Sequence, residues 1–374
     1  MSKNYYITFD VPEGSEQQYN SPVPTILKTR YICSKFNGNL NVVSLASKKN
    51  IGLGKKKRMS YGVLKTLFSF GVHTKIGKWL DTILRKTYLF FFLIFVVKKR
   101  DKVLIYHSSY TNCISKFLTA KKCISVLEVE EIYGYDAIGD KSSLQDEIKS
   151  ILKFKKYIFV NDYIPVEFDI DKKDFVVCYG VVDSNYKKHE KTFNKNKIHI
   201  LYAGTIEDRK LGAFSTAHAA NFLSNNYVMH IAGFGKEASL EKLREIIENN
   251  NRDNEKCMIE FHGMLSGEEL NKLIDNCDIG VSAYIMRSNF ANNSLPSKIM
   301  TYMTHDLHIV SGYSEAIADS KIAKNWQFFY NHDPESIANA IKSVDVSEKI
   351  DNSQLLKEID DNLFEFLKNE GFIE

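Results

Sequence analysis

Residues 198–210 read IHILYAGTIEDRK, and they join a short apolar run to a glycine and two adjacent cations. The run at 198–203 is apolar and ends at a glycine, which predicts a buried strand. Gly204 follows this strand, and Arg209 and Lys210 precede the helix expected at 211–223. Glycine lets the backbone approach a phosphate group, while a helix N-terminus and two cations can neutralise its charge. The stretch therefore predicts a strand, loop and helix that bind a diphosphate.

Further glycine-containing loops accompany the other strands expected in this half of the chain. They are AGFG at 232–235, FHG at 261–263, CDIG at 277–280 and the loop NSLPSK at 293–298, which opens a helix expected at 295–303. Free backbone N–H groups, the Ser297 hydroxyl and Lys298 in the first turn of that helix would suit a diphosphate. One such loop is usually only a turn, but several along one sheet edge indicate a ligand site.

Short apolar runs alternate with helical patterns along the chain, which is typical of doubly wound parallel sheets. In the first half we expect strands at 5–9, 41–45, 102–107, 123–129, 157–161 and 175–178, and helices at 24–36, 143–154 and roughly 59–97, with breaks near Gly71 and Gly77. In the second half we expect strands at 198–203, 228–232, 258–261, 278–283 and 308–311, and helices at 211–223, 239–249, 267–276, 295–303, 334–342 and 354–368. The predicted fold is therefore α/β, with two Rossmann-like domains at 1–183 and 198–345 that face a cleft, joined by a polar linker at 184–197.

Length and composition agree with this organisation. A chain of 374 residues with 44% apolar and 26% charged residues fits two globular domains. The six cysteines form no C-x-x-C pair, which argues against zinc-ribbon and thioredoxin-like proteins. The first ten residues, MSKNYYITFD, contain no apolar signal core, so we expect a cytoplasmic protein with reduced thiols.

Charge is distributed unevenly between the two halves. Residues 1–183 contain 29 lysines and arginines against 18 acidic residues, and only Asp81 and Asp101 are acidic between residues 25 and 127. The apolar run YLFFFLIFVV at 88–97 is too short to span a bilayer, but aromatic and basic residues interleave from 55 to 100. This pattern favours an interfacial helix on an anionic membrane over a buried helix with solvated ends. Nucleic acid is disfavoured because no binding signature accompanies the charge.

The order of motifs in residues 198–310 resembles the donor domain of GT-B-fold retaining glycosyltransferases of the family-4 type. That family shows a glycine and cations after the first strand, a glycine pair, F-x-G, a strand beginning Cys-Asp, and an L-P-S-K-x-x-x-Y-M helix, here at 295–303. The stretch YGVVD at 179–183 resembles the N-G-V-D that ends the acceptor domain of this family. The resemblance further implies that a last helix within 346–374 crosses back to the first domain.

The resemblance implies roles for particular residues. It assigns catalysis to Arg209 and Lys210, which would stabilise charge on the departing diphosphate, and to Glu130 across the cleft. The implied donor-binding residues are Gly204, Thr205, Gly233, Phe234, Phe261, His262, Gly263, Met264, Asn293, Ser294, Leu295, Ser297, Lys298 and Thr301. The implied acceptor-binding residues are Gly14, Ser15 and Tyr133. For Arg209 and Lys210 the alternative is a solvated helix start, and for Gly14 and Ser15 a simple turn.

Three positions depart from the family pattern. Asn293 and Thr301 stand where the family usually has two glutamates, one touching the sugar and one the ribose. Both side chains can still hydrogen-bond a hydroxyl, but without charge. Glu130 stands where the family tends to have a histidine, and its alternative is a surface acidic turn.

These expectations combine into one function. A sugar would pass from a nucleotide diphosphate sugar, UDP favoured over GDP, to a lipid-linked or other membrane-associated glycan, with retention of configuration. The resemblance implies bacterial surface-polysaccharide synthesis of the O-antigen or capsule kind, at the inner face of the plasma membrane. It also implies no metal or other cofactor, since cations and helix dipoles handle the leaving diphosphate. A catalytically silent GT-B subunit and a GT-B sugar-nucleotide epimerase remain alternatives, and the sequence does not bear on the sugar, the linkage or the oligomeric state.

Overall fold

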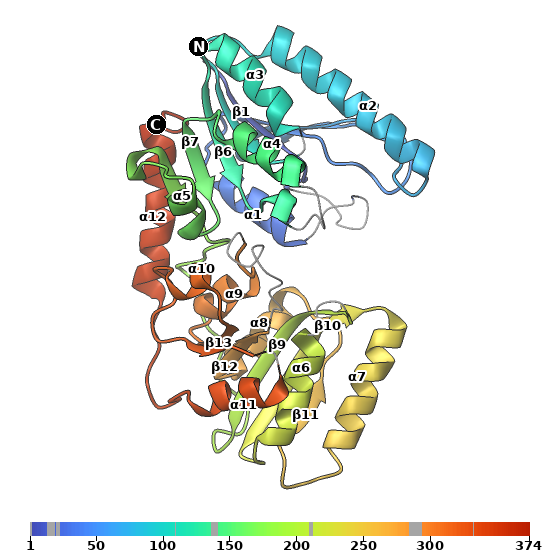
Figure 1. Cartoon of the computed structure of the whole chain (residues 1–374), viewed down its shortest axis with the longest axis vertical. Helices are drawn as coiled ribbons and strands as arrows, with labels where there is room; N and C mark the ends of the chain where they lie inside the picture. Colours follow the sequence, from blue (N-terminus) through green and yellow to red (C-terminus); the bar gives the residue numbers. More distant parts are fainter. Residues whose placement is uncertain are drawn as a thin grey trace. The chain divides into compact units, whose positions relative to one another are not determined.

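The computed structural model describes residues 2–12, 19, 23–108, 110–135, 141–208, 212–283, 294–331 and 333–374. The chain divides into two compact units, one formed by Met1–Val181 with Ile359–Glu374 and the other by Val182–Glu358. Each unit is built on its own largely parallel sheet with helices around it (Figure 1). The predicted α/β class with two parallel-sheet domains is therefore confirmed.

The first unit contains an eight-stranded sheet in the order β3-β4-β2-β1-β5-β6-β7-β8. Its strands are β1 (Asn4–Thr8), β2 (Leu40–Ser44), β3 (Lys56–Met59), β4 (Gly62–Thr66), β5 (Lys102–Tyr106), β6 (Ile124–Val129), β7 (Lys156–Phe159) and β8 (Phe175–Val177). Its helices are α1 (Val23–Ser34), α2 (Lys75–Phe91), α3 (Thr111–Lys121), α4 (Lys141–Ile151), α5 (Tyr163–Glu167) and most of α12 (Ser353–Asn369). Every residue of β1 is buried, because a central parallel strand is covered on both faces.

One predicted helix in this unit is wrong over part of its length. Residues 59–66 belong to an antiparallel hairpin of β3 and β4 at the sheet edge, not to a helix spanning 59–97. Gly62 has a φ of +143°, and a Cβ at this position would lie 2.0 Å from the Leu40 carbonyl oxygen, so the strand can pair closely with β2 only because residue 62 is glycine. Gly77 does not break the helix but lies in the first turn of α2, where its N–H donates to the Thr74 hydroxyl.

The second unit contains six parallel strands in the order β11-β10-β9-β12-β13-β14. They are β9 (Ile198–Ile206), β10 (Tyr227–Gly235), β11 (Met258–Phe261), β12 (Ile279–Ser282), β13 (His308–Gly312) and β14 (Gln327–Phe329). The helices are α6 (Gly212–Ala219), α7 (Glu237–Asn250), α8 (Gly267–Asn276), α9 (Lys298–Thr304), α10 (Glu315–Ala318) and α11 (Pro334–Lys342). Strands β10 and β11 are added on one side of β9, and β12, β13 and β14 on its other side, so the order of strands reverses between β9 and β12. The carboxyl ends of these two strands therefore mark the usual ligand position of a doubly wound sheet.

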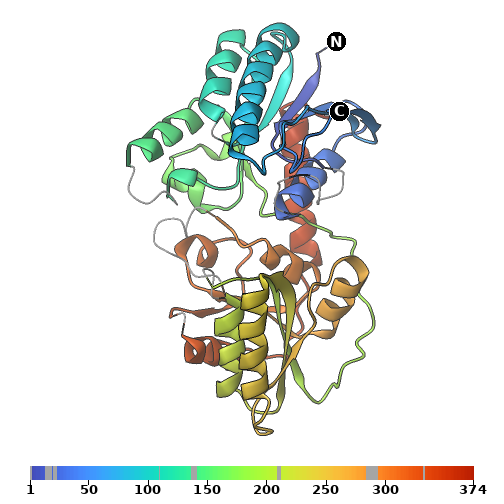
Figure 2. The ribbon, with the colours of Figure 1, turned by 90° about the vertical axis from the view of Figure 1, so that its right-hand side faces the viewer.

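The main core of the second unit covers one face of its sheet. Ile200, Met229 and Ile231 point to one face, where they form a fully buried core with α6, α7 and α11. Figure 2 shows α6 and α7 side by side over this face. Because side chains alternate along a strand, His199 and His230 point to the other face.

The last helix of the chain ends in the first unit. The Asn4 side-chain amide donates to the Phe372 carbonyl oxygen at 2.7 Å, and the Tyr31 hydroxyl donates to Asp360 Oδ1 at 2.5 Å. The fully buried Phe372 ring meets the Phe36 ring edge to face. The two ends of the chain therefore lie in the same unit (Figure 1).

Candidate functional site

The carboxyl edge of the second sheet brings three of the predicted glycines together. Gly204 of β9 and Gly233 of β10 are partners in register, and the Gly233 N–H donates to the Gly263 carbonyl oxygen at 2.7 Å. A Cβ on Gly233 would lie 1.9 Å from the Gly204 carbonyl oxygen, so this spacing of β9 and β10 requires glycine. The result is a strip of bare backbone at the ends of three neighbouring strands.

Lys298 reaches this strip from α9, the helix between β12 and β13. It is the first residue of α9, and its Nζ lies 3.9 Å from the centroid of the Tyr202 ring. A Cβ on Gly204 would lie 3.1 Å from the same nitrogen, so the Lys298 amine rests directly over the end of β9. A cation therefore lies beside exposed backbone at the carboxyl end of β9. This combination suits an anionic ligand.

The CDIG segment has a different position from the one expected. Cys277 and Asp278 precede β12 and lie at the amino edge of the sheet, where the Asp278 carboxylate accepts the His199 N–H at 2.9 Å. Gly280 lies within β12, and a Cβ there would come within 2.5 Å of the Tyr302 ring. Tyr302 also accepts the Ala203 N–H through its hydroxyl at 3.1 Å. This motif therefore packs α9 onto the sheet and positions Lys298; it is not a fourth ligand loop.

The other predicted donor residues divide into three groups. Phe234, Met264, Ser297 and Thr301 are exposed, while Thr205, Phe261, His262 and Leu295 are half-buried and Ser294 is buried. Arg209, Lys210 and Asn293, together with Gly14 and Ser15 of the acceptor set, lie outside the described residues.

Glu130 follows β6 in the first unit and is held by a buried cation. It forms an ion pair with Lys28 of α1, whose amine also donates to the Cys178 carbonyl oxygen at 2.7 Å. Beneath this pair lies Glu128, which is fully buried and accepts the Tyr6 hydroxyl at 2.5 Å. Burial, and then the nearby Glu130 charge, raise the pKa of Glu128, whereas Lys28 opposes this shift. Sequence analysis identified Glu130 but not Lys28, because nothing in an isolated lysine on a helix predicts an ion pair with a residue about a hundred positions away.

Tyr133 lies beside the same strand ends. Its ring stacks on His107 at a centroid distance of 5.5 Å, and its N–H donates to Glu147 Oε1 at 2.9 Å. Glu147 also contacts His107 Nε2 at 2.7 Å and accepts the Gly134 N–H. Glu147 therefore holds the turn that carries Tyr133, and the tyrosine remains 43% exposed, so that its ring can contact a ligand.

A cavity of about 380 Å³ opens between the strand ends and α2 in the first unit. Its lining residues are Phe9, Leu45, Ala46, Ser47, Lys49, Val72, His73, Lys78, Thr82, Arg85 and Tyr110. Arg85 is buried, pairs with Asp81 and donates to the Leu45 and Ala46 carbonyl oxygens at 2.7 and 2.8 Å. Lys49 is half-buried, and His73 and Lys78 are exposed. No sequence motif predicted this cavity, because its walls come from four separate segments of the chain.

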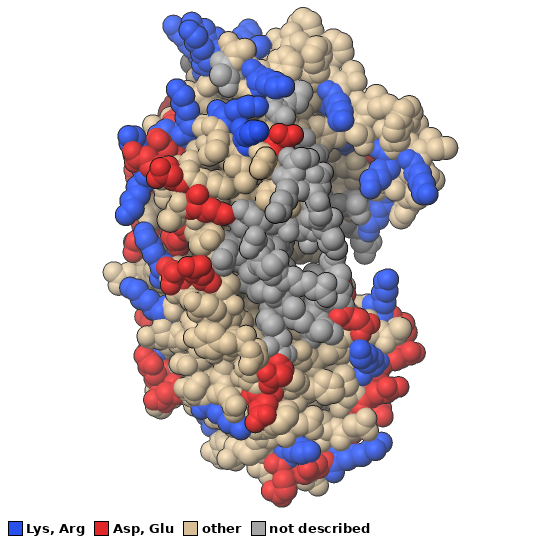
Figure 3. Space-filling view, in the orientation of Figure 1, with Lys and Arg blue, Asp and Glu red and all other residues tan. Residues whose placement is uncertain are grey.

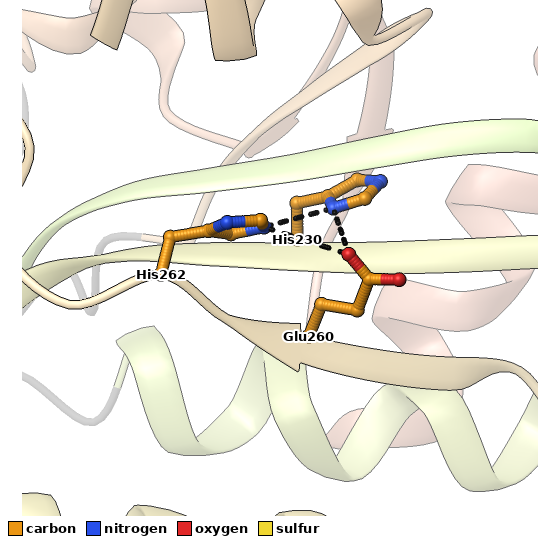
Figure 4. Close-up of side chains that lie close together, drawn as sticks. All are labelled: His230, Glu260 and His262. Carbon is orange, nitrogen blue, oxygen red and sulfur yellow. Dashed lines mark hydrogen bonds and ion pairs between the residues drawn. The ribbon is translucent and has the colours of Figure 1, made fainter. Parts of the chain in front are cut away.

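One group of described side chains has the composition of a metal site. His230 of β10, Glu260 of β11 and His262 after β11 bring a carboxylate oxygen and two imidazole nitrogens together (Figure 4). Burial, and then the neighbouring His262 and His199, lower the pKa of His230 to about 3, so this imidazole is neutral at physiological pH.

Comparison with known proteins supports the fold. No family model and no curated protein matches the sequence. Among solved structures, the trehalose-6-phosphate synthase OtsA matches over 98% of both chains with 9% identity and a TM-score of 0.68. The UDP-forming trehalose-phosphate synthase of Burkholderia xenovorans matches over 99% of this chain and 98% of its own, with 9% identity and a TM-score of 0.62. HepE of Anabaena in complex with UDP matches over 98% of this chain and 95% of its own, with 11% identity and a TM-score of 0.62.

These matches span both units of the chain. The two parallel α/β sheets and the coverage of whole chains identify the architecture as the GT-B fold. The matched proteins include trehalose-phosphate synthases, so the resemblance to the family-4 type rests on the sequence motifs. At identities of 9–11%, these matches show the fold of this chain and leave its activity to the chemistry of the site.

Proposed function

We propose that this protein is a retaining glycosyltransferase that moves a sugar from a nucleotide diphosphate sugar to a membrane-associated glycan. We favour a UDP-sugar over a GDP-sugar as the donor. The observation that carries the proposal is the contact of Lys298 with the glycine strip at the carboxyl edge of the second sheet. The GT-B fold and the UDP bound by the structurally similar HepE support the same class of donor. The sequence motifs, rather than the comparisons, support a family-4 enzyme of surface-polysaccharide synthesis.

The chemistry follows from charge that develops on the leaving group. As the bond between the sugar and the diphosphate breaks, negative charge grows on the departing phosphate oxygens. The Lys298 ammonium would lie beside them, and we assign the same task to Arg209 and Lys210. Fixed cations of this kind lower the barrier because they are oriented before the reaction begins. The bare backbone of Gly204 and Gly233 would leave room for the diphosphate to approach the sheet edge.

The surface of α2 supports a membrane-associated acceptor. Ile76, Trp79 and Ile83 lie three and four residues apart on this helix, and their side chains are 72%, 63% and 43% exposed. Phe91 and Phe95 continue the exposed apolar surface, and basic residues surround it. Figure 3 shows lysine and arginine side chains near α2. An exposed apolar stripe among cations is the composition of an interfacial helix on an anionic bilayer.

None of the helices in the described part of the chain is both long enough and apolar enough to cross a membrane. From the exposed apolar side chains of α2 we propose a peripheral contact at the inner face of the plasma membrane, with these side chains inserted between acidic head groups.

The cavity beside α2 supports the same acceptor. Lys78 and Thr82 belong both to α2 and to the cavity wall, so an acceptor in the cavity would lie next to the proposed membrane surface. Lys49, His73 and Lys78 would attract an anionic group, such as the phosphate of a lipid-linked glycan.

A donor and acceptor screen tests the proposal. The purified chain is first mixed with UDP- and GDP-sugars, and thermal unfolding is followed, because a bound ligand raises the apparent stability. Transfer is then measured with lipid-linked glycans in phosphatidylglycerol vesicles. We expect at least one UDP-sugar to raise Tm and to serve as donor. Absence of a shift with every nucleotide, UDP included, would contradict the proposal.

A catalytically silent GT-B subunit is the second candidate. It is favoured by Asn293 and Thr301 in place of two glutamates and by the ion pair that engages Glu130 with Lys28. Both candidates predict nucleotide binding. Only the transferase predicts that the single chain releases UDP from a UDP-sugar, either to an acceptor or to water.

A further inference from the structure

Three side chains on the face of the second sheet opposite α6, α7 and α11 converge on one point. His230 Nδ1 lies 3.0 Å from His262 Nε2, and Glu260 Oε2 lies 3.4 Å from the first nitrogen and 3.8 Å from the second. Residues 230 and 260 are register partners on β10 and β11, and residue 262 points to the same face two positions later (Figure 4). Two of the three side chains are therefore fixed by paired strands, and the third directly follows β11, where its N–H donates to the Ile231 carbonyl oxygen of β10 at 2.9 Å.

These distances match one face of a tetrahedral metal site. With metal–ligand bonds of about 2.0–2.2 Å, donor atoms around a tetrahedral zinc ion lie roughly 3.3–3.5 Å apart. The separation of 3.4 Å lies within that range, and those of 3.0 and 3.8 Å depart from it by a few tenths of an ångström. The side chains of His230, His262 and Glu260 are 2%, 25% and 42% exposed, so the pocket is closed at its base and open to solvent on one side. A water molecule would occupy the fourth position.

A second ring holds the buried ligand in the required tautomer. His199 Nε2 lies 3.1 Å from the Asn194 carbonyl oxygen, which can only accept, so this nitrogen must carry a hydrogen. His199 Nδ1 is then an acceptor, and it receives the hydrogen of His230 Nε2 at 2.9 Å. His230 Nδ1 is left with its lone pair directed at His262 and Glu260. Histidine ligands of metals are generally oriented in this way by a hydrogen bond from their other nitrogen.

We propose that His230 Nδ1, His262 Nε2 and Glu260 Oε2 bind one divalent transition-metal ion, and that this ion is Zn²⁺. Two imidazoles and one carboxylate suit Zn²⁺, Co²⁺ or Ni²⁺, whereas Mg²⁺ and Ca²⁺ prefer oxygen ligands only. On binding, the hydrogen on His262 Nε2 moves to its Nδ1, so the imidazole stays neutral while Nε2 binds the ion. The ion would tie β10 to β11 and brace the turn at 261–263, and its binding does not depend on the proposed transferase activity.

Metal titration of the tag-free, full-length chain tests this proposal. The protein is freed of metal with a chelator, and Co²⁺ is added while the visible absorption of tetrahedral Co²⁺ is recorded; Zn²⁺ then displaces it. We expect one ion per chain and the loss of the cobalt band on zinc addition. His262→Gln and Glu260→Gln, both at partly exposed positions, should each weaken binding by about 10-fold or more.

Two further variants make the test specific. His199→Ala leaves all three ligands in place, and we expect about 10–100-fold weaker binding from loss of the orienting hydrogen bond. His218→Ala removes an exposed histidine of α6 and should leave the affinity and stoichiometry unchanged. No saturable binding in the wild-type chain would overturn the proposal, as would equal affinity of the wild type, His262→Gln and Glu260→Gln.

Discussion

Lys298 combines two functions at the residue scale. Its amine packs on the Tyr202 ring and above Gly204, while its backbone begins α9. A cation placed this way should act mainly on charge that develops during the reaction. We therefore expect Lys298→Ala to lower kcat by about 10²-fold and to raise the donor KM much less.

Steady-state kinetics with the best donor from the screen would check this prediction. Lys342→Ala is the matched control, since Lys342 is exposed at the far end of α11 and should have no effect. Wild-type kcat and KM in Lys298→Ala would mean that the donor binds elsewhere.

Glu128 provides a second prediction at the residue scale, on pH. Its pKa is raised in the folded protein by burial and then by Glu130, so the folded state holds a proton that the unfolded state has already lost. Stability should therefore fall as pH rises from the unfolded pKa to the higher folded pKa, and remain lower above it. Glu128→Gln removes the ionisable group and should raise the stability above that of wild type at pH 8.5 but not at pH 5, by about 1 kcal/mol or roughly 2–4 °C in Tm.

Thermal unfolding at the two pH values measures this difference. The exposed substitution Glu365→Gln should leave the pH dependence of Tm as in wild type. A Glu128→Gln protein that is destabilised more at pH 8.5 than at pH 5 would show that the carboxylate is stabilised in the folded state.

At the scale of elements, α2 carries the prediction on membranes. Ile76 and Trp79 expose apolar side chains beside Lys75 and Lys78, so they can insert between head groups at little cost to the fold. We expect the double variant Ile76→Ser, Trp79→Ser to bind phosphatidylglycerol vesicles at least 10-fold more weakly, because insertion of apolar surface supplies part of the binding energy. Added salt should weaken binding of the wild type.

Vesicle co-sedimentation provides the measurement. Tyr330→Ser, at a 70% exposed aromatic position of the second unit, should bind as the wild type does. Equal binding to neutral and anionic vesicles would remove the electrostatic part of the proposal, and unchanged binding of the double variant would remove the part assigned to α2.

Elements also show where sequence patterns were sufficient and where they were not. The bounds of α8 and α11 agree with the prediction because each has a clear apolar period and a clear start, with Asp333 capping α11 through the Ser336 N–H. The β3 and β4 hairpin was missed because β3 is a short edge strand rich in charged residues, as edge strands often are, and the apolar residues of the hairpin also fit a helical spacing. The glycine strip was predicted because Gly204 and Gly233 directly follow the apolar runs at 198–203 and 228–232, although both glycines lie within the longer strands β9 and β10 of the structure. The ion pair of Glu130 and the cavity beside α2 depend on contacts between distant segments, which no local pattern contains.

At the scale of the whole molecule, the last residues of the chain pack in the same unit as the first. Phe372 is fully buried in the first unit, whereas Phe329 is fully buried in the core of the second. Replacing a buried phenylalanine with alanine typically costs about 3–5 kcal/mol, because apolar contacts are lost and a cavity remains. We expect Phe372→Ala to destabilise the unit that contains residues 1–181, although it lies at the opposite end of the sequence.

Hydrogen exchange resolved by peptide can distinguish the two units. In Phe372→Ala, peptides of β1, β2 and α1 should exchange faster, while those of β9 and β10 should keep their protection. Phe329→Ala is the matched variant, and it should produce the reverse pattern because its ring belongs to the other core. Faster exchange confined to residues 182–358 in Phe372→Ala would show that the last residues stabilise the second unit instead. If each variant affects only its own core, the two units unfold separately, and UDP should then slow exchange in the second unit alone, because a ligand stabilises the unit that binds it.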